Sequence, residues 1–333
     1  MSLDVATTSG SSKPRPKFRV PRWLDTAFLV AGVGLLAFVV TRFPLADVLA
    51  ACVRVGPVFA VTPFIALAWA CTNARGLHTL MGGRVPWRVL VWNRLVGDGY
   101  NNLLPLAGLG GEPFKLRHLS QYVPAEQALT GLLRDRLTEN AVGFLFSATW
   151  LLIGVPRFGV AGALRVAVLT YAAVVTAVAV FYVLVLTTRL PGRFSTAATR
   201  WLGIKSEAVE PLPVSRLVKA ALWYLVGRGL GLVEIAALFA LLGLGFDPFA
   251  VGFTYSAVQA AGFIGFAIPQ GLGVFEGTSV WIFDLLGFAG SLGVAFIFAR
   301  RGRLLLVSLV GVGLHLYSRV RGEGSVPESE PEA

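Results

Sequence analysis

Long apolar runs separated by short polar segments make up most of the chain. A run of about 20 apolar residues is long enough for one helix to cross the hydrocarbon core of a bilayer. The pattern therefore predicts an all-α, polytopic integral membrane protein with about six to eight transmembrane helices. The predicted spans are residues 23–41, 57–80, 141–155, 164–186, 220–242 and 291–317.

Residues 86–104 break this pattern, because their apolar positions are interleaved with Arg88, Arg94 and Asp98. Ionisable side chains at membrane depth are costly and avoid the lipid face. We therefore expect this segment to be interfacial or buried inside the protein.

Residues 97–120, GDGYNNLLPLAGLGGEPFKLRHLS, contain a proline and glycine break. Pro105 removes a backbone donor, and the glycines after it loosen the chain. Non-helical backbone at membrane depth is tolerated only where protein buries it or where it lines a wet cavity. We predict a re-entrant hairpin: a helix, a glycine-rich tip and a second helix capped by Gly111 or Glu112.

A similar segment lies at residues 263–277, where Pro269 and Glu276 have the seven-residue spacing of Pro105 and Glu112. Paired hydrophobic segments interrupted by glycine and proline, one in each half of a membrane protein, point to the binding site of a transporter. Three predicted spans separate the two segments. Because this number is odd, the two hairpins are expected to enter from opposite faces, as in an inverted repeat.

Charge fixes the expected orientation and domain limits. Residues 1–22 are basic and are expected to form a disordered cytoplasmic arm, and the polar connection at residues 189–219 also has a positive excess, typical of the cytoplasmic side. Residues 23–320 then form one transmembrane domain. Residues 321–333 form an acidic tail, also expected to be disordered. The predicted location is the inner (plasma) membrane.

Composition narrows the function classes. The chain has 333 residues, of which 55% are hydrophobic and 14% charged, and its formal charge is +11. The mean hydropathy of +0.71 is far from that of a soluble domain. Since the basic residues flank apolar runs, we expect an anionic lipid and not a nucleic acid as partner.

No pattern for catalysis, metal or cofactor binding is evident. The histidines are scattered, the two cysteines form no CxxC motif, and nucleophile-elbow, P-loop and dinucleotide motifs are missing from the sequence. We expect no metal, no cofactor and no enzyme activity.

Glu112 and Glu276 are the first candidates for function, because an ionisable group inside a membrane is a functional hypothesis by default. The alternative is that each glutamate caps the helix that follows its glycine turn. Both roles are compatible.

Basic residues near the first hairpin form a second set of candidates. Lys115, Arg117, Arg134 and Arg136 could hold a lipid phosphate. Alternatively they extend to the interface, or they pair with Asp135 and Glu139, which share a helical face.

The later charges allow similar alternatives. Arg228 and Glu234 are six residues apart, so each is expected to pair with another helix. Arg300 and its neighbours Arg301 and Arg303 either join the lipid pocket or mark the inner end of a helix.

Four pieces of the sequence resemble the lysylphosphatidylglycerol synthase transmembrane region, or flippase-like domain family: residues 101–119, 132–137, 268–277 and 300–303. The chain departs from the family pattern at Asp135, usually a glutamate, and at Leu106 and Gln270, usually glycines. The residues that match are Asn102, Pro105, Gly111, Glu112, Arg136, Pro269, Gly271, Gly273 and Glu276.

The resemblance implies a protein that moves lipids between leaflets or supports a glycolipid, hopanoid or aminoacyl-phospholipid pathway. Family members that transfer amino acids carry a further soluble domain, so this chain is not expected to make a lysyl-lipid. The candidate lipid-site residues are Asp98, Asn102, Pro105, Gly111, Glu112, Lys115, Arg117, Arg134, Arg136, Pro269, Gly271, Gly273, Glu276 and Arg300.

Two other functions remain open at this point. The protein could be a membrane-embedded transferase that uses Asp98 and Glu112 as acid and base. It could also be a non-catalytic partner of enzymes that make a lipid or glycolipid.

Overall fold

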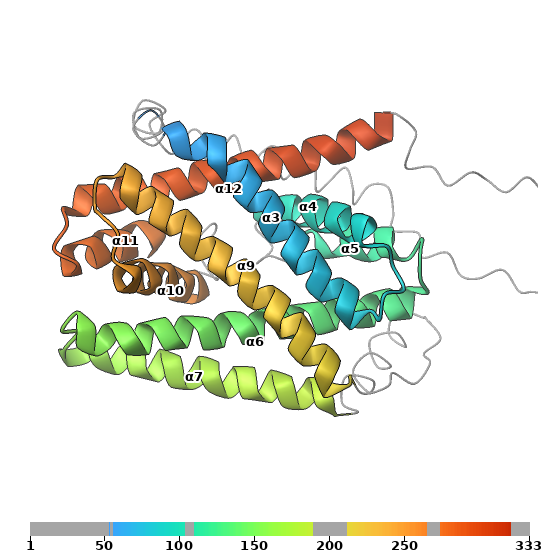
Figure 1. Cartoon of the computed structure of the whole chain (residues 1–333), viewed down its shortest axis with the longest axis horizontal. Helices are drawn as coiled ribbons and strands as arrows, with labels where there is room; N and C mark the ends of the chain where they lie inside the picture. Colours follow the sequence, from blue (N-terminus) through green and yellow to red (C-terminus); the bar gives the residue numbers. More distant parts are fainter. Residues whose placement is uncertain (1–52, 54–55, 104–109, 189–211, 265–273, 321–333) are drawn as a thin grey trace, which may run out of the picture.

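The computed structural model describes residues 53, 56–103, 110–188, 212–264 and 274–320. In these residues the secondary structure is all helical, and no strand occurs. The helices are α3 (Gly56–Leu80), α4 (Trp87–Leu103), α5 (Glu112–Leu119), α6 (Ala125–Arg157), α7 (Gly162–Thr187), α9 (Val214–Leu241), α10 (Pro248–Ile264), α11 (Val274–Leu285) and α12 (Gly290–Val320) (Figure 1).

Four of these helices, α3, α6, α7 and α9, are long and apolar enough to cross a membrane. They confirm the predicted spans at residues 57–80, 141–155, 164–186 and 220–242, and with them the all-α, polytopic class. Helix α6 is longer than its predicted span, because residues 125–140 continue the same helix in spite of their charges. The predicted span at residues 23–41 lies outside the described residues.

Two pairs of short helices lie between the long ones. The first pair, α4 and α5, lies toward the right of Figure 1, and the second pair, α10 and α11, lies toward the left. The predicted tips, residues 104–109 and 265–273, lie outside the described residues. Helices α6, α7 and α9 separate the two pairs along the chain. The two pairs lie toward opposite ends of the bundle in Figure 1, which agrees with the expected inverted arrangement.

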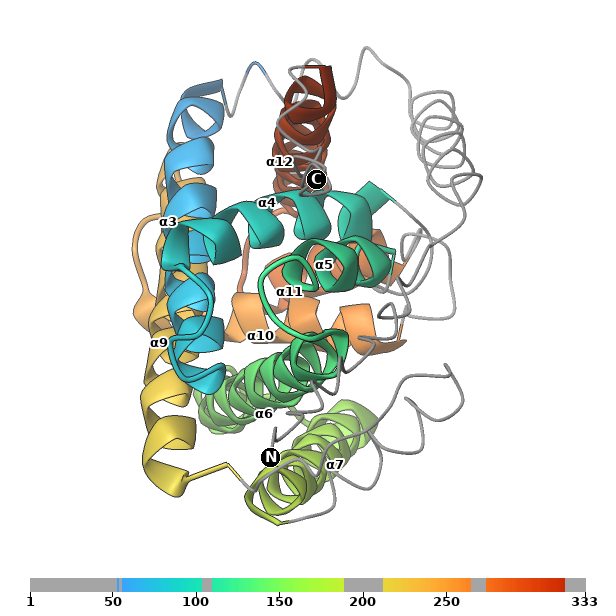
Figure 2. The same ribbon diagram turned by 90° about the vertical axis from the view of Figure 1, so that its right-hand side faces the viewer.

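The packing of the helices follows an inverted repeat. One unit runs from α3 through the first pair to α6, and the other runs from α9 through the second pair to α12. Helix α3 packs along α9, α4 packs against α12, and α10 packs against α6. Each hairpin therefore rests on the long helix that follows the other hairpin, as Figure 2 shows from the side.

Helix α12 approaches both hairpins closely. A Cβ atom on Gly311 would lie 2.4 Å from the carbonyl oxygen of Leu95 in α4. A Cβ atom on Gly293 would lie 2.5 Å from the carbonyl oxygen of Ser279 in α11. Such contacts leave no room for a side chain, so α12 is fixed to the first hairpin near one end and to the second near the other.

Helix α12 also continues through its three arginines without a break. At 1.5 Å per residue, Arg300 lies roughly 15 Å from Gly290 and roughly 30 Å from Val320. The interpretation of these arginines as the inner end of a helix is therefore wrong, because they lie in its interior.

The largest apolar core belongs to the second hairpin. It joins residues of α6, α9, α10, α11 and α12, and its fully buried aromatic side chains are Phe239, Phe253, Phe283 and Phe296. Helix α7, in contrast, exposes large apolar side chains such as Phe181 and Leu184. These side chains suit contact with lipid chains.

The close contact at Gly311 can be tested by substitution. We expect Gly311→Ala to destabilise the protein by about 1–3 kcal/mol, the usual cost of overpacking, because the added methyl group must push α12 away from α4. The measurement is thermal unfolding in detergent, followed by tryptophan fluorescence.

The matched control is Gly313→Ala, two residues away on the same helix, where a Cβ atom has nothing within 4 Å. Alanine favours helix over glycine by about 1 kcal/mol, so this variant should be as stable as the parent or slightly more stable. Equal melting temperatures for the two variants would contradict the proposed contact.

Candidate functional site

Arg94 of α4 is the centre of a buried network of charges. The residue is only 2% exposed. Its Nε donates to Asp98 Oδ2 at 3.1 Å and its Nη1 to Asp135 Oδ2 at 2.7 Å, while its Nη2 donates to Glu139. All three nitrogens of the guanidinium therefore contact carboxylates, two of which belong to α6.

Lys115 extends this network to the second helix of the hairpin. Its Nζ lies 2.7 Å from Asp98 Oδ1 and 3.2 Å from Glu112 Oε1. Glu112 Oε1 also accepts a hydrogen bond from Arg136 Nη2 of α6 at 2.9 Å. The ion pairs thus join α4, α5 and α6 to one another.

Helix α9 completes the network. The hydroxyl group of Tyr224 donates to Asp135, and Arg228 Nη2 donates to the backbone oxygen of Glu139 at 3.3 Å. The charged members are equal in number, four cations and four carboxylates: Arg94, Lys115, Arg136, Arg228, Asp98, Glu112, Asp135 and Glu139. We call these eight residues the balanced network.

Small residues let the two helices of the first hairpin approach each other. A Cβ atom on Gly111 would lie 1.9 Å from the carbonyl oxygen of Gly97, and one on Gly97 would lie 2.4 Å from Cε of Lys115. The backbone N–H of Gly111 donates to Asn101 Oδ1 at 2.7 Å, and Asn101 Nδ2 donates to Glu112 at 3.3 Å. The sequence at the tip therefore brings the Glu112 carboxylate back to α4.

These contacts decide several sequence-based alternatives. The sequence predicted either Gly111 or Glu112 as the N-cap of the second hairpin helix. Gly111 is the N-cap of α5, and Glu112 is the first residue of the helix. The Glu112 carboxylate forms ion pairs with Lys115 and Arg136. The cap role is therefore wrong for this glutamate.

The basic residues near the first hairpin were predicted to pair with Asp135 and Glu139. Ion pairs do form, but with other carboxylates. Lys115 and Arg136 are paired, but with Asp98 and Glu112. Arg94 takes the two carboxylates of α6, Asp135 and Glu139, in their place.

The remaining candidates near the first hairpin are less enclosed. Arg117 of α5 is exposed, and Asn102 of α4 and Arg134 of α6 are half-buried. Four candidates lie outside the described residues, namely Pro105, Pro269, Gly271 and Gly273. Their roles stay predictions.

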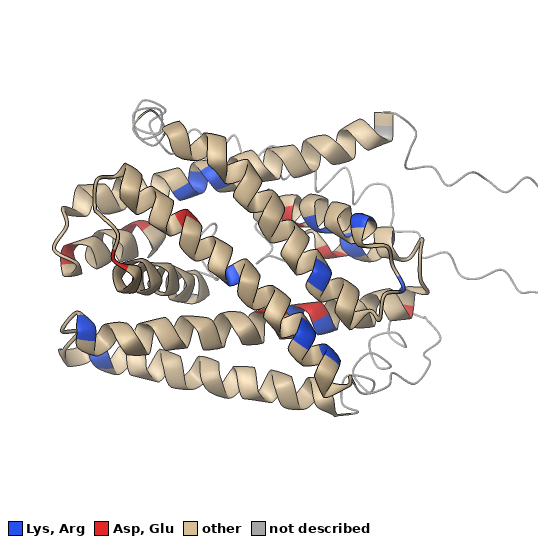
Figure 3. Ribbon diagram, in the orientation of Figure 1, with Lys and Arg blue, Asp and Glu red and all other residues tan. Residues whose placement is uncertain are grey.

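A second set of charges lies where α9, α11 and α12 meet, as the coloured ribbon of Figure 3 shows. Arg301 Nη2 lies 2.6 Å from Glu276 Oε1, and Arg303 Nη1 lies 3.2 Å from Glu234 Oε2. Arg300 stands beside them on α12. We call these five residues the α12 cluster: Glu234, Glu276, Arg300, Arg301 and Arg303.

The prediction that Arg228 and Glu234 each pair with another helix is confirmed. Arg228 Nη1 donates to the hydroxyl oxygen of Tyr255 in α10 at 3.4 Å, in addition to its bond to α6. Glu234 pairs with Arg303 of α12.

The two sets of charges follow the inverted repeat. In each half, a glutamate in the first turn of the second hairpin helix pairs with an arginine on the next long helix, Glu112 with Arg136 and Glu276 with Arg301. The halves differ in the neighbouring charges, because α6 carries acidic residues and α12 carries further arginines.

The family comparison agrees with this architecture. The model of the lysylphosphatidylglycerol synthase TM region matches residues 24–311. The chain belongs to this family. It is thereby a lipid-related membrane protein, and the resemblance seen in the sequence is confirmed. Neither the search of curated proteins nor that of solved structures gave a match.

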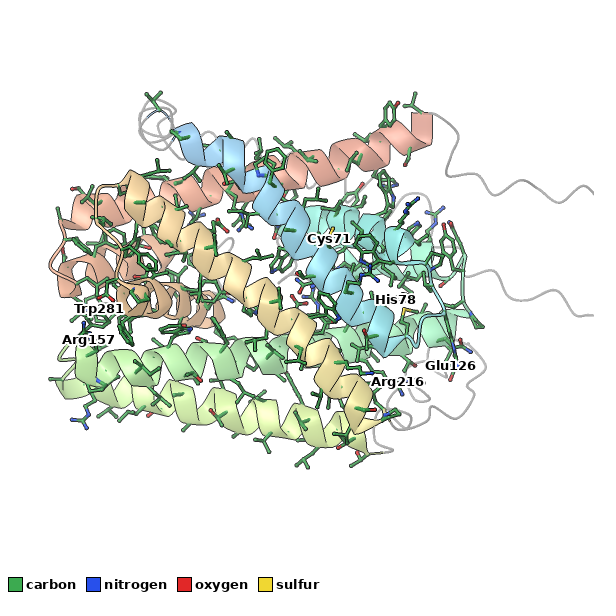
Figure 4. All side chains as sticks on the ribbon, viewed as in Figure 1. Cys71, His78, Glu126, Arg157, Arg216 and Trp281 are labelled. Atoms are coloured by element: carbon green, nitrogen blue, oxygen red, sulfur yellow. The ribbon has the colours of Figure 1, made fainter. Side chains whose placement is uncertain are left out.

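The described residues hold no group of histidine, cysteine, aspartate and glutamate side chains suited to bind a metal ion. His78 and Cys71 lie apart on α3, as labelled in Figure 4. The ring of His78 instead bonds through Nδ1 to the backbone oxygen of Val85 at 2.9 Å. The carboxylates of the balanced network are engaged by arginine and lysine.

Arg94 is the central site residue that sequence reasoning missed, and Tyr224 was missed as well. Two signals were available. Arg94 and Asp98 are four residues apart on one helix, and Asp135 and Glu139 are four apart on another with like charges facing the same way. Two buried acids on one helical face require a cation from another helix, and this cation is Arg94 of α4.

Removal of Arg94 should strongly destabilise the protein. Arg94→Met leaves three carboxylates without their shared cation, and breaking a buried ion pair from one side costs about 3–5 kcal/mol. The measurement is the free energy of unfolding in mixed detergent micelles.

The matched control is Arg88→Met, on the same helix, where the side chain is exposed. Its expected effect is within about 0.5 kcal/mol. If both variants are equally stable, Arg94 is not the centre of the network.

Proposed function

We propose that this protein is a transporter of the inner membrane that moves or presents an anionic lipid between the two leaflets. The lipid would be a phospholipid, a glycolipid or a hopanoid derivative. One observation carries the proposal: two pairs of short helices lie toward opposite ends of the bundle, and each holds a glutamate paired with an arginine of a long helix. Membership of a lipid-related membrane family supports it.

The distribution of charge supports an orientation with the N-terminus in the cytoplasm. Arg75, Arg84 and Arg88 lie around the junction of α3 and α4, the end of the bundle that also carries Glu126 and Arg216 in Figure 4. Arg157 and Trp281 mark the opposite end in that view. Under the positive-inside rule the first of these ends faces the cytoplasm.

The two glutamate–arginine pairs provide a means of alternating access. Both pairs are formed in this structure, at 2.9 Å in the first half and 2.6 Å in the second. A lipid head group can pass a hairpin only when the hairpin separates from its long helix. An anion that takes the place of the glutamate beside the arginine would favour this separation, while the acyl chains remain in the bilayer.

The ion pairs favour transport over the transferase alternative. Asp98 lies 3.1 Å from Arg94 and 2.7 Å from Lys115, and Glu112 also has two cationic partners. A general acid or base must contact the substrate atom whose proton it transfers, whereas both carboxylates here contact cations of the protein itself. An accessory role in lipid synthesis remains a prediction that no contact of the described residues favours.

The test is lipid flux in reconstituted vesicles that contain a fluorescent anionic phospholipid and are bleached from outside. We expect Glu276→Gln and Glu112→Gln each to lower the flux, because the glutamate–arginine pair must re-form to close the hairpin behind the lipid, and glutamine cannot restore that charged contact. A charged hydrogen bond contributes about 1.5–3 kcal/mol, which corresponds to a loss of about 10- to 150-fold.

Asp284→Asn is the matched control, because Asp284 lies on α11 with Glu276 but is exposed. Its flux should equal that of the parent protein. Parental flux in both glutamate variants, with melting temperatures unchanged, would exclude the glutamates from the mechanism. No flux in the parent protein would remove the transport proposal itself.

A further inference from the structure

The α12 cluster carries more positive than negative charge. It contains three arginines and two glutamates, so one positive charge has no acidic partner within the cluster. The arginines lie in the interior of a 31-residue helix. An uncompensated charge buried inside a membrane protein is costly and is a candidate for an ion or substrate path.

The surplus charge belongs to Arg300, because Arg301 and Arg303 each form an ion pair, and Arg303 adds a second buried donor. Arg300 Nη1 and Arg303 Nε are buried, and within the described part of the chain neither atom has an acceptor. Among the same residues no carboxylate forms an ion pair with Arg300, whose guanidinium lies 6.0 Å from the ring centre of Phe296. Since a buried donor without an acceptor is destabilising, these atoms are suited to an acceptor from outside the chain.

The two arginines are placed to act together. They are three residues apart and so share one face of α12. Arg303 is held by Glu234 of α9 through Nη1, which leaves its Nε on another edge of the guanidinium. The close contacts at Gly293 and Gly311 fix the helix on both sides of the pair. The donors are therefore held in position before any ligand arrives.

The balanced network of the first half offers no equivalent site. Its four cations are matched by four carboxylates, and Arg94 donates from all three nitrogens. An added anion there would have to displace a carboxylate. In the second half an added anion would instead neutralise a charge and accept bonds from buried donors.

We propose that Arg300 and Arg303 form the anion subsite of this protein and bind the phosphate of a phosphodiester lipid. A phosphodiester carries one negative charge, which equals the surplus of the cluster, and its two free oxygens suit the planar donors of arginine. A phosphomonoester would bring a second charge, and diacylglycerol would bring none. The proposal names the chemical group of the substrate that the transporter would recognise, and so it rests on the proposed function. Binding of that group can nevertheless be measured without transport.

The experiment is equilibrium binding of fluorescent phosphatidylglycerol to the purified protein in neutral detergent. We expect Arg300→Gln and Arg303→Gln each to weaken binding by about tenfold or more, as expected for the loss of a charged hydrogen bond. Arg165→Gln, at an exposed position of α7, should leave it unchanged. Equal affinities for all these proteins would overturn the proposal.

Competitors identify the group that is bound. Unlabelled phosphatidylglycerol should displace the probe, while diacylglycerol and inorganic phosphate at the same concentration should not. Displacement by diacylglycerol would show that the acyl chains alone are bound. Displacement by inorganic phosphate would show a site for a free anion. Either result would overturn the lipid phosphodiester assignment.

Arg300→Lys serves where the glutamine variants fail to fold, because lysine keeps the charge and loses the planar donors. It should still weaken binding, and parental affinity in this variant would overturn the proposal. The outcomes also separate the two proposals. Weakened binding together with no flux in the parent protein retains the subsite and removes the transporter. Unchanged binding in the arginine variants, together with loss of flux in Glu276→Gln, retains the transporter and removes the subsite.

Discussion

The cost of burying the Arg94 guanidinium is the constraint on which the first half of the structure depends. A charge removed from water is tolerated only when opposite charges and hydrogen-bond acceptors replace its hydration shell. Arg94 obtains them from its own helix and from α6, and those acids in turn require Lys115, Arg136 and Tyr224. Satisfying one buried charge thereby fixes the relative positions of α4, α5, α6 and α9.

Hydropathy was sufficient to predict the long helices, because lipid imposes the same composition on every span. The breaks at Pro105 and Pro269 predicted two pairs of short helices, and the odd number of spans between them predicted an inverted arrangement of the pairs. The hydropathy pattern failed where charged side chains are buried inside the protein and are not exposed to water. Residues 125–140 were separated from their span because they are charged, but they face the hairpin and continue α6.

The partners within the site could not be predicted from spacing. Arg94 meets Asp135 and Glu139 from 41 and 45 residues away. Such pairs depend on the rotation of each helix and on close approaches such as that of Gly97 and Gly111. The sequence could place acids and bases in the same region, but only the packed structure shows Arg94 as the partner of Asp135.

The two halves of the repeat are held by different forces, which bears on how a transporter of this design would move. The first hairpin is bound to α6 by directional ion pairs from both of its helices. The second is held mainly by apolar packing around Phe253 and Phe283, with Glu276 as its charged contact to α12. Apolar surfaces slide past one another with little change in buried area, whereas ion pairs must be broken before they can re-form. Within the proposed mechanism, the second hairpin therefore moves more readily than the first, and it does so beside Arg300, which carries the surplus charge.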